Sequence, residues 1–359
     1  MGTSRRGATF DEQNRKPENA RSLQVSGKPE TSRDDAPLER FIARRFLRNA
    51  HLQTLAGNFL RRDNRLPKPQ DRLFQVEENV QVLCHCHWQP YSQSRATVLI
   101  VHGLEGSSLS QYVIGTGSKA WDLGMNVVRM NMRNCGGTEH LTSTLYHSGL
   151  SNDVGSVVRT LLEQEKLERI GLVGYSMGGN LVLKLAGEWG SNAPPELKAV
   201  ATVSPSADLA ASADAIHEKA NRVYEWKFLL NLMRRYRRKC SLFPEIYRKT
   251  RLPRSIREFD DLIIAPHNGF AGAQDYYDRA SASRVADKIA VPTLVVHSTD
   301  DPFIRMLPET RDKFAGNTHV TLVETQHGGH CAFIAHPNGY DGRWAERQII
   351  EFFLRHGMA

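Results

Sequence analysis

The sequence predicts an α/β fold with a mostly parallel central sheet, helices on both faces and a helical cap insertion. Short apolar runs that fit buried strands alternate with helical segments over most of the chain. A strand, a sharp turn and a helix meet at Ser176, because the apolar run 170–173 precedes Gly-Tyr-Ser-Met-Gly and the apolar segment 180–186 follows it. This alternation breaks between residues 204 and 290, where a long insertion of helical composition fits a cap.

The strands are predicted, in chain order, from short apolar runs between turn residues. They are residues 74–76, 80–87, 97–101, 126–130, 169–173, 199–203, 293–297 and 318–323. In the second run, Cys84, His85, Cys86 and His87 alternate, so the cysteines face one side of the strand and the histidines face the other. Four ligands cannot converge from opposite faces, and we expect no metal site there.

Residues 1–36 are rich in Ser, Arg, Asp, Glu, Asn and Pro and have no apolar periodicity. We expect this segment to be a disordered tail and residues 37–359 to form one domain. The tail has neither the apolar core of a secretory signal nor the acid-poor composition of a transit peptide. Together with only five cysteines, this favours reduced thiols and a cytoplasmic location. No apolar stretch reaches the roughly 18 residues of a membrane span.

The cap is expected at about residues 206–290, with helical composition at 213–239 and again near 271–283. Its first helical segment interleaves apolar residues with six basic ones: Lys227, Arg234, Arg235, Arg237, Arg238 and Lys239. The favoured interpretation is a solvated face whose apolar stripe packs on the protein. The alternative is a basic amphipathic helix that contacts anionic lipid or an anionic substrate. The net charge is +8, but no nucleic-acid motif accompanies it, and we expect no nucleic-acid partner.

Ser176 is the predicted nucleophile. The glycines at positions 174 and 178 relieve crowding in a strained turn, so the hydroxyl can project at the edge of the sheet with a helix N-terminus behind it. A serine hydroxyl is a poor nucleophile near neutral pH, so it needs a base to take its proton and an acid to orient that base.

The base and the acid are sought after the serine, in the order acid then histidine. Asp300 and Asp301 follow the predicted strand 293–297, and His327 and His330 follow the next one. Asp301 is favoured because Pro302 leaves its side chain free to point along the loop, whereas Asp300 could cap the turn. His330 is favoured because a glycine pair precedes it and apolar residues 331–334, expected to begin a helix, follow it.

The negative oxygen that develops on an acyl group during reaction needs hydrogen-bond donors. The natural donors are the backbone amides of Met177, directly after the serine, and of Leu104, in the loop after strand 97–101. We expect His102, in the same loop, to have a structural role and to brace the loop through hydrogen bonds.

The chain resembles the YheT-like branch of the α/β-hydrolase superfamily, a group of esterases and lipid acyl hydrolases. The resemblance covers roughly residues 41–359, and the segments that carry it are 47–54 (LRNAHLQT), 102–107, 132–137, 146–149, 256–260, Tyr276, Tyr277 and Ser281. It implies the α/β-hydrolase fold and a catalytic triad of Ser176, Asp301 and His330. One departure is Asn134, where the family often has Gly; the loop was expected to lie away from the triad.

These observations predict a serine hydrolase that cleaves carboxylic esters, with medium or long acyl chains as the expectation from the resemblance. We expect a small-molecule acyl ester as substrate, and neither a cofactor nor a metal. Peripheral contact with membrane lipid would fit the basic cap. Two alternatives are an acyltransferase that uses the same triad and a catalytically silent protein that binds ligands or membranes.

Overall fold

The computed structural model describes residues 39–359. The segment predicted to be a disordered tail, residues 1–36, lies outside the described residues. None of the helices in the described part of the chain has the length and apolar composition needed to cross a bilayer.

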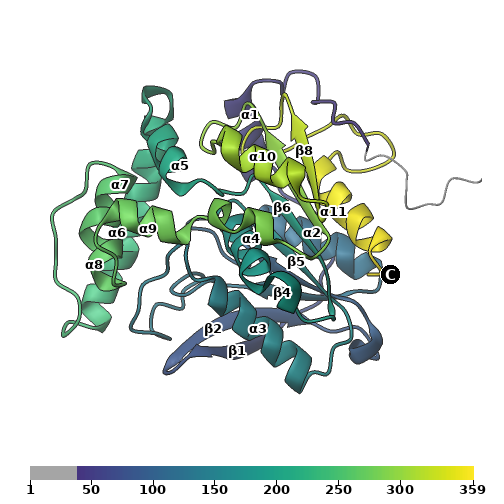
Figure 1. Ribbon diagram of the computed structural model, residues 1–359, viewed down its shortest axis with the longest axis horizontal. Helices are drawn as coiled ribbons and strands as arrows, with labels where there is room; N and C mark the ends of the chain where they lie inside the picture. Colours follow the sequence, from purple (N-terminus) through teal and green to yellow (C-terminus); the bar gives the residue numbers. More distant parts are fainter. Residues whose placement is uncertain (1–38) are drawn as a thin grey trace, which may run out of the picture. The chain divides into compact units, whose positions relative to one another are not determined.

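The centre of the molecule is an eight-stranded sheet with the strand order β1-β2-β4-β3-β5-β6-β7-β8 (Figure 1). The strands from β4 to β8 in this order are parallel, whereas β1 and β2 form an antiparallel pair at one edge. The predicted mostly parallel sheet is therefore confirmed. The strand bounds are β1 Gln70–Glu77, β2 Val80–His87, β3 Thr97–Val101, β4 Asn126–Met130, β5 Ile170–Tyr175, β6 Leu197–Val203, β7 Thr293–Ser298 and β8 Val320–Thr325.

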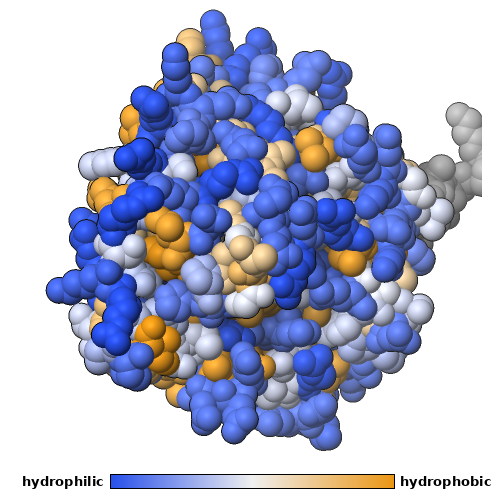
Figure 2. Space-filling model, turned by 60° about the vertical axis from the view of Figure 1, so that its left-hand side comes forward, coloured by the Kyte–Doolittle hydropathy of each residue, from blue (hydrophilic) through white to orange (hydrophobic). Residues whose placement is uncertain are grey.

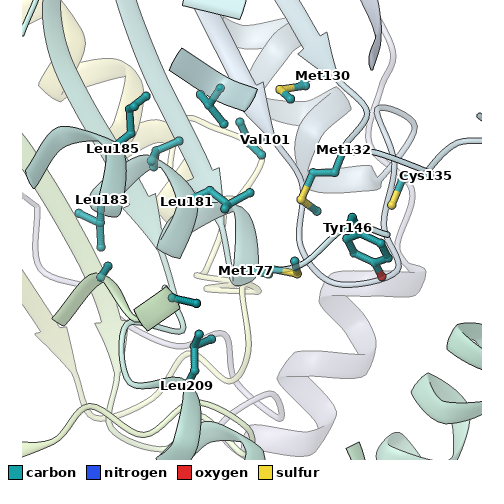
Figure 3. Packing of buried hydrophobic residues seen from close by; sticks show 14 of the residues in the cluster. Val101, Met130, Met132, Cys135, Tyr146, Met177, Leu181, Leu183, Leu185 and Leu209 are labelled. Atoms are coloured by element: carbon teal, nitrogen blue, oxygen red, sulfur yellow. The ribbon is translucent and has the colours of Figure 1, made fainter. Parts of the chain in front are cut away.

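Helices cover both faces of the sheet, because successive residues of the central strands are buried on opposite sides. Val98 and Ile100 of β3 pack in a core with the side chains of α2 and α11, whereas Leu99 and Val101 pack with those of α3 and α4. Figure 3 shows part of this second core, with Val101 near the leucines of α4. These helices are α2 Gln111–Asp122, α3 Ser151–Gln164, α4 Met177–Trp189 and α11 Trp344–Arg355, and α10 is Pro308–Gly316.

The chain between β6 and β7 forms a group of helices to one side of the sheet (Figure 1). They are α5 Leu209–His217, α6 Arg222–Leu242, α7 Ile256–Phe259, a π-helical turn Asp260–Ile264, α8 Ala265–His267 and α9 Ala273–Ala280. The 3-10 turns among residues 39–359 are Ser92–Ser94, Gly190–Asn192, Lys219–Asn221, Ala282–Arg284 and Ala286–Lys288. Figure 2 shows separate apolar patches among hydrophilic side chains on the face that this group helps to form.

The helical composition at 213–239 corresponds to two helices rather than one. Glu218 has an extended backbone, with ψ of 149°, and ends α5. Asn221 then fixes the break, because its side-chain amide donates to the carbonyls of Ala215, at 2.9 Å, and Pro302, at 2.6 Å.

The prediction that residues 331–334 begin a helix is wrong. Cys331 and Phe333 have φ angles of 57° and 41°, in the left-handed region that a right-handed helix cannot use. Ile334 instead forms an isolated bridge with Arg343, and the helix begins only at Trp344. The apolar side chains are buried, but in a loop that packs against the rest of the chain.

The remaining helix, α1, spans Ala50–Phe59. The side chain of Asn49 caps it by accepting hydrogen bonds from the backbone amides of His51, at 3.0 Å, and Leu52, at 3.1 Å. This helix contacts the loop that contains His330.

Candidate active site

Ser176 lies in a sharp turn between β5 and α4, with φ of 54° and ψ of −118°. The turn needs glycine on both sides because the backbone is crowded there. A Cβ at Gly174 would lie 2.4 Å from the carbonyl oxygen of Gly178, and one at Gly178 would lie 2.4 Å from that of His102. Backbone strain of this kind is typical of functional sites.

The structure brings Ser176, His330 and Asp301 together. The Nε2 atom of His330 lies 3.0 Å from the hydroxyl oxygen of Ser176. Its Nδ1 atom lies 2.9 Å from Oδ2 of Asp301. In the neutral imidazole, Nδ1–H donates to the carboxylate and Nε2 accepts from the hydroxyl, which is the arrangement of a base that can take the serine proton.

Asp301 is held so that one oxygen faces His330. Its Oδ1 atom accepts hydrogen bonds from the backbone amides of Phe303, at 2.9 Å, and Ile304, at 3.0 Å, which leaves Oδ2 for the imidazole. Burial acts to raise the pKa of Asp301, but the charge of His330 and these hydrogen bonds hold it below its usual value. For His330 burial acts in the opposite direction and would lower the pKa, but the Asp301 carboxylate raises it well above its ordinary value.

Asp300 and His327, the two alternatives in the sequence, pair with each other rather than with the serine. Nδ1 of His327 lies 3.4 Å from Oδ2 of Asp300. The other carboxylate oxygen accepts from the hydroxyl of Ser298 and from the amide of Gly329, the latter at 2.9 Å. Asp300 therefore holds the loop that contains His330, which we call the histidine loop, as a turn residue does.

Two residues of α1 hold the histidine loop and were not given a role from the sequence. The hydroxyl of Thr54 accepts from the backbone amide of His330, at 2.9 Å. The amide side chain of Gln53 pairs with both backbone groups of Ile334, at 2.9 and 3.2 Å. The only available signal was that both residues belong to the segment 47–54 that carries the resemblance.

The two predicted oxyanion donors lie beside the serine. Leu104 and Met177 line the same cavity as Ser176 and His330. The amide of Met177 belongs to the first turn of α4, where N–H groups lack acceptors within the helix. No described residue accepts a backbone hydrogen bond from Leu104. Both amides are therefore available to a ligand, and their role in catalysis remains a prediction.

His102 contacts the backbone on both sides of its ring. Its Nδ1 lies 2.7 Å from the carbonyl of Gly103, and its Nε2 accepts from the amide of Met132, at 3.1 Å. Burial lowers the pKa of His102 to about 4, so the ring is neutral near pH 7. These contacts give it the bracing role expected from the sequence.

Glu105 ties the loop that contains Leu104 to the cap helix α6. Its carboxylate accepts from Nε and Nη2 of Arg235, at 3.0 and 3.1 Å, and from the hydroxyl of Tyr146, at 2.5 Å. Arg235 also donates to the carbonyl of Asn134. Asn134 has φ of 64°, which explains why glycine suits this position and why asparagine is tolerated. This loop, expected to lie away from the triad, is thus joined through Arg235 to Glu105, the neighbour of Leu104.

The basic run of α6 is not a uniformly solvated face. Arg234, Arg237 and Arg238 are exposed, but Arg235 is half-buried and Lys239 is buried. The Lys239 ammonium donates to the carbonyls of Glu139, at 3.2 Å, and of Thr142. Burial lowers its pKa to about 8. The expectation of a solvated face is therefore correct for part of the run only.

The histidines and cysteines of β2 face opposite sides of the strand. Cys84 and Cys86 are buried in the core, where burial raises the pKa of Cys86 to about 12. His85 lies 2.9 Å from the hydroxyl of Ser108, and His87 accepts from Arg129, at 3.0 Å. Among residues 39–359, no cluster of three or more His, Cys, Asp or Glu side chains is arranged to hold a metal ion.

Two cavities meet at Ser176 and His330. The smaller, of about 120 Å³, has a mainly apolar wall formed by the cap. Figure 3 shows three of its lining residues, Tyr146, Met177 and Leu209. The larger, of about 440 Å³, lies between α1 and α6 and includes the polar side chains of Asn58, Lys227 and Asn231. Both cavities are mainly apolar, and these polar side chains distinguish the larger one, so the two branches can hold the two halves of an amphipathic ester.

Comparisons with known proteins agree with this geometry. A family model described as "alpha/beta hydrolase fold" matches residues 96–337. The protein named "Putative esterase YheT" from Escherichia coli is 32% identical, over 87% of this chain and 92% of its own length. A monoacylglycerol lipase of Saccharomyces cerevisiae is 27% identical, over 72% of this chain and 59% of its own length. The solved structure of the Pyrococcus furiosus esterase Pf2001 aligns with a TM-score of 0.53 at 19% identity, over 80% of this chain and 93% of that one.

Proposed function

Because the chain belongs to the α/β-hydrolase fold family, in its YheT-like esterase branch, we propose that it hydrolyses carboxylic esters with Ser176 as nucleophile, His330 as base and Asp301 as the orienting acid. The observation that carries the proposal is the continuous hydrogen-bond chain from Ser176 through His330 to Asp301, at 3.0 and 2.9 Å. It lies where two cavities meet.

The reaction follows from these contacts. Nε2 of His330 takes the hydroxyl proton as Ser176 Oγ bonds to the acyl carbon, and the amides of Leu104 and Met177 donate to the carbonyl oxygen as it becomes negative. The C–O bond of the ester then breaks, and the alcohol leaves with the proton from His330. Water enters and gives His330 a proton as its oxygen bonds to the acyl carbon. Ser176 regains a proton when the carboxylic acid departs.

We assign the acyl chain to the smaller cavity and the alcohol part to the larger one. The cap side chains in the smaller cavity are mostly apolar, including Leu209, Ile216, Leu232 and Phe259, which suits a medium or long acyl chain. The larger cavity offers amide, hydroxyl and ammonium groups, which suit a polar alcohol. The name of the yeast relative, a monoacylglycerol lipase, supports a lipid ester as the substrate class.

A lipid surface suits the entrance to the larger cavity. Leu55, Phe59, Val223 and Lys227 line this cavity and are exposed; we call them the entrance rim. Phe59 and Val223 are 68% and 77% exposed, and the Lys227 ammonium lies 5.7 Å from the centre of the Phe59 ring. Exposed apolar side chains beside a cation favour peripheral contact with anionic lipid. The rim therefore supports substrate uptake from a lipid surface.

A fluorophosphonate probe tests the nucleophile. We expect the wild-type protein to be labelled covalently at Ser176 and the Ser176→Ala variant to remain unlabelled. Hydrolysis of p-nitrophenyl esters of rising chain length, measured in parallel, should be lost in the same variant. A folded wild-type protein that is neither labelled nor active would contradict the proposal. Transfer of the acyl group to added alcohol in preference to water would instead identify an acyltransferase.

A further inference from the structure

The wall of the smaller cavity contains a serine hydroxyl that the protein leaves without a partner. Ser212 lies on the same face of α5 as Leu209, Ala213 and Ile216, all of which line the cavity. The residue is 8% exposed, and its Oγ atom has no hydrogen-bond partner among the described residues. A buried hydroxyl without a partner destabilises the folded protein, and alanine would avoid this cost.

A carboxyl group lines the same cavity. Asp260 begins the π-helical turn after α7 and is nearly buried. Its Oδ2 atom accepts a hydrogen bond from the hydroxyl of Tyr277, at 2.7 Å, and no hydrogen bond to Oδ1 comes from another described residue. Burial raises the pKa of Asp260 to about 7, so near neutral pH the group is present in both protonation states. It can then accept or donate a hydrogen bond.

The tyrosine hydroxyls of this wall, in contrast, have partners within the protein. Tyr146 donates to Glu105, Tyr277 donates to Asp260, and Tyr276 accepts from the amide of Ser148, at 2.8 Å. His147 is neutral, because burial lowers its pKa to about 3, and its Nδ1 accepts from the amide of Gly149. No Lys or Arg among the described residues lines the cavity, which disfavours a carboxylate end group on the ligand.

We infer that the smaller cavity takes an acyl chain that carries a hydroxyl group, and that Ser212 and Asp260 are the hydrogen-bond partners of this hydroxyl. The inference rests on the proposed ester hydrolysis and adds the substrate class. A hydroxyl both donates and accepts, so it can pair with a serine hydroxyl and with a carboxyl group in either protonation state, and both residues line this cavity. A site built to bond a substrate hydroxyl discriminates against the analogue without it, because its own polar groups are then left unpaired.

The test compares p-nitrophenyl esters of one chain length, unsubstituted or with a single hydroxyl at each position along the chain. We expect wild-type kcat/KM to be highest for a hydroxyl at one position. Ser212→Ala should lower kcat/KM for that ester about fivefold relative to the unsubstituted ester, as expected for one neutral hydrogen bond. Asp260→Asn should also reduce the ratio of kcat/KM for the hydroxylated ester to kcat/KM for the unsubstituted ester. Ile216→Val, on the same face of α5, is the control and should change kcat/KM for both esters by the same factor.

The inference fails if the wild-type enzyme hydrolyses the unsubstituted ester at least as well as every hydroxylated one. It also fails if Ser212→Ala lowers kcat/KM equally for both esters, which is the result if water alone hydrogen-bonds to the Ser212 hydroxyl. Either result leaves the hydrolase proposal intact, because the unsubstituted ester is still cleaved and the fluorophosphonate probe still labels Ser176.

A binding measurement separates recognition of the chain from catalysis. In the Ser176→Ala background, titration calorimetry should show tighter binding of the free hydroxy fatty acid than of the plain fatty acid. Adding Ser212→Ala should remove this difference. Equal affinities in the Ser176→Ala background would overturn the inference independently of any turnover.

Discussion

Asp301 determines the charge state of His330. The imidazole lies in a largely buried site, where burial alone would keep it neutral. The carboxylate at 2.9 Å reverses this preference and stabilises the imidazolium. In the proposed reaction, the same pair would stabilise the charge that His330 acquires on taking the serine proton.

We expect the pH profile of kcat/KM to report this pair. Only neutral His330 can accept a proton, and its pKa lies above the ordinary value of 6.5, so activity should rise with pH and reach half its maximum above pH 6.5. Asp301→Asn removes the negative charge, leaves burial as the main influence and should move the midpoint to lower pH. It should also lower kcat by about 10³ to 10⁴-fold.

Asp300→Asn is the matched control for this profile. Asp300 is the neighbouring acid but pairs with His327 and not with His330. Its substitution should leave the midpoint where it is in the wild-type enzyme. A midpoint that shifts in Asp300→Asn and not in Asp301→Asn would contradict the assignment of Asp301 as the orienting acid.

At the scale of elements, the loop after β3 is tied to the cap by a largely buried ion pair. Glu105, next to Leu104, pairs with Arg235 of α6, and the two side chains are 5% and 13% exposed. Loss of Glu105 leaves Arg235 with only the more distant carboxylate of Glu139, at 3.7 Å, in a largely buried position, so we expect a cost of up to about 3–5 kcal/mol. The pair also fixes the backbone of the loop from which the Leu104 amide would donate.

Glu105→Gln should therefore lower the free energy of unfolding and also lower kcat more than it raises KM. Removal of one oxyanion donor costs roughly 10²–10³ in kcat, and a displaced donor should cost up to this amount. Denaturant titration and steady-state kinetics measure the two effects. The double variant with Arg235→Met should recover part of the stability, because no unpaired charge remains.

Arg238→Met is the control for the ion pair. Arg238 lies on the same helix and is 58% exposed, with Nε 3.5 Å from Glu139. We expect its substitution to change the free energy of unfolding by less than about 0.5 kcal/mol. If Arg238→Met and Glu105→Gln changed the free energy of unfolding equally, the buried position of the Glu105–Arg235 pair beside the loop would not matter.

Elements set by local pattern were predictable, and those set by distant contacts were not. The apolar runs located all eight strands within a few residues, and the glycines at positions 174 and 178 indicated the turn at Ser176. The break in the 213–239 segment depends on Asn221, which reaches Pro302 across 81 positions. The loop at 331–334 depends on Gln53, which is 281 positions away. Such contacts leave no periodic signal in the sequence.

At the scale of the whole molecule, the two cavities and the entrance rim define the orientation in which we expect the substrate to enter and bind. The smaller branch, to which we assign the acyl chain, lies under the cap, and the larger branch opens between α1 and α6. Ser176, Asp301 and His330 could be proposed from the sequence because each follows a strand. The rim could not, because it combines α1 with a helix more than 160 positions later.

We expect the rim to govern binding to lipid vesicles. Phe59→Ser combined with Val223→Ser should weaken binding to vesicles of phosphatidylcholine and phosphatidylglycerol at least about tenfold, since two apolar side chains no longer enter the lipid. Hydrolysis of a dissolved short-chain ester should be affected much less. Co-sedimentation with vesicles and steady-state kinetics measure the two effects.

Leu123→Ser provides the comparison for the rim. Leu123 is 49% exposed but lines a different pocket together with Arg169, which directly precedes β5, at the opposite end of that strand from Ser176. Its substitution should leave vesicle binding unchanged. An equal loss from Leu123→Ser would show that binding depends on general surface hydrophobicity rather than on the entrance.

The hydrogen bond from His330 to Thr54 has a consequence for how the enzyme matures. Thr54 on α1 is synthesised 276 positions before His330, whose backbone amide donates to its hydroxyl. A nascent polypeptide therefore cannot form this hydrogen bond until His330 has been synthesised, and trimming the protein to the matched region 96–337 would remove the helix that provides the acceptor. The placement of the proposed base thus depends on a segment translated long before it.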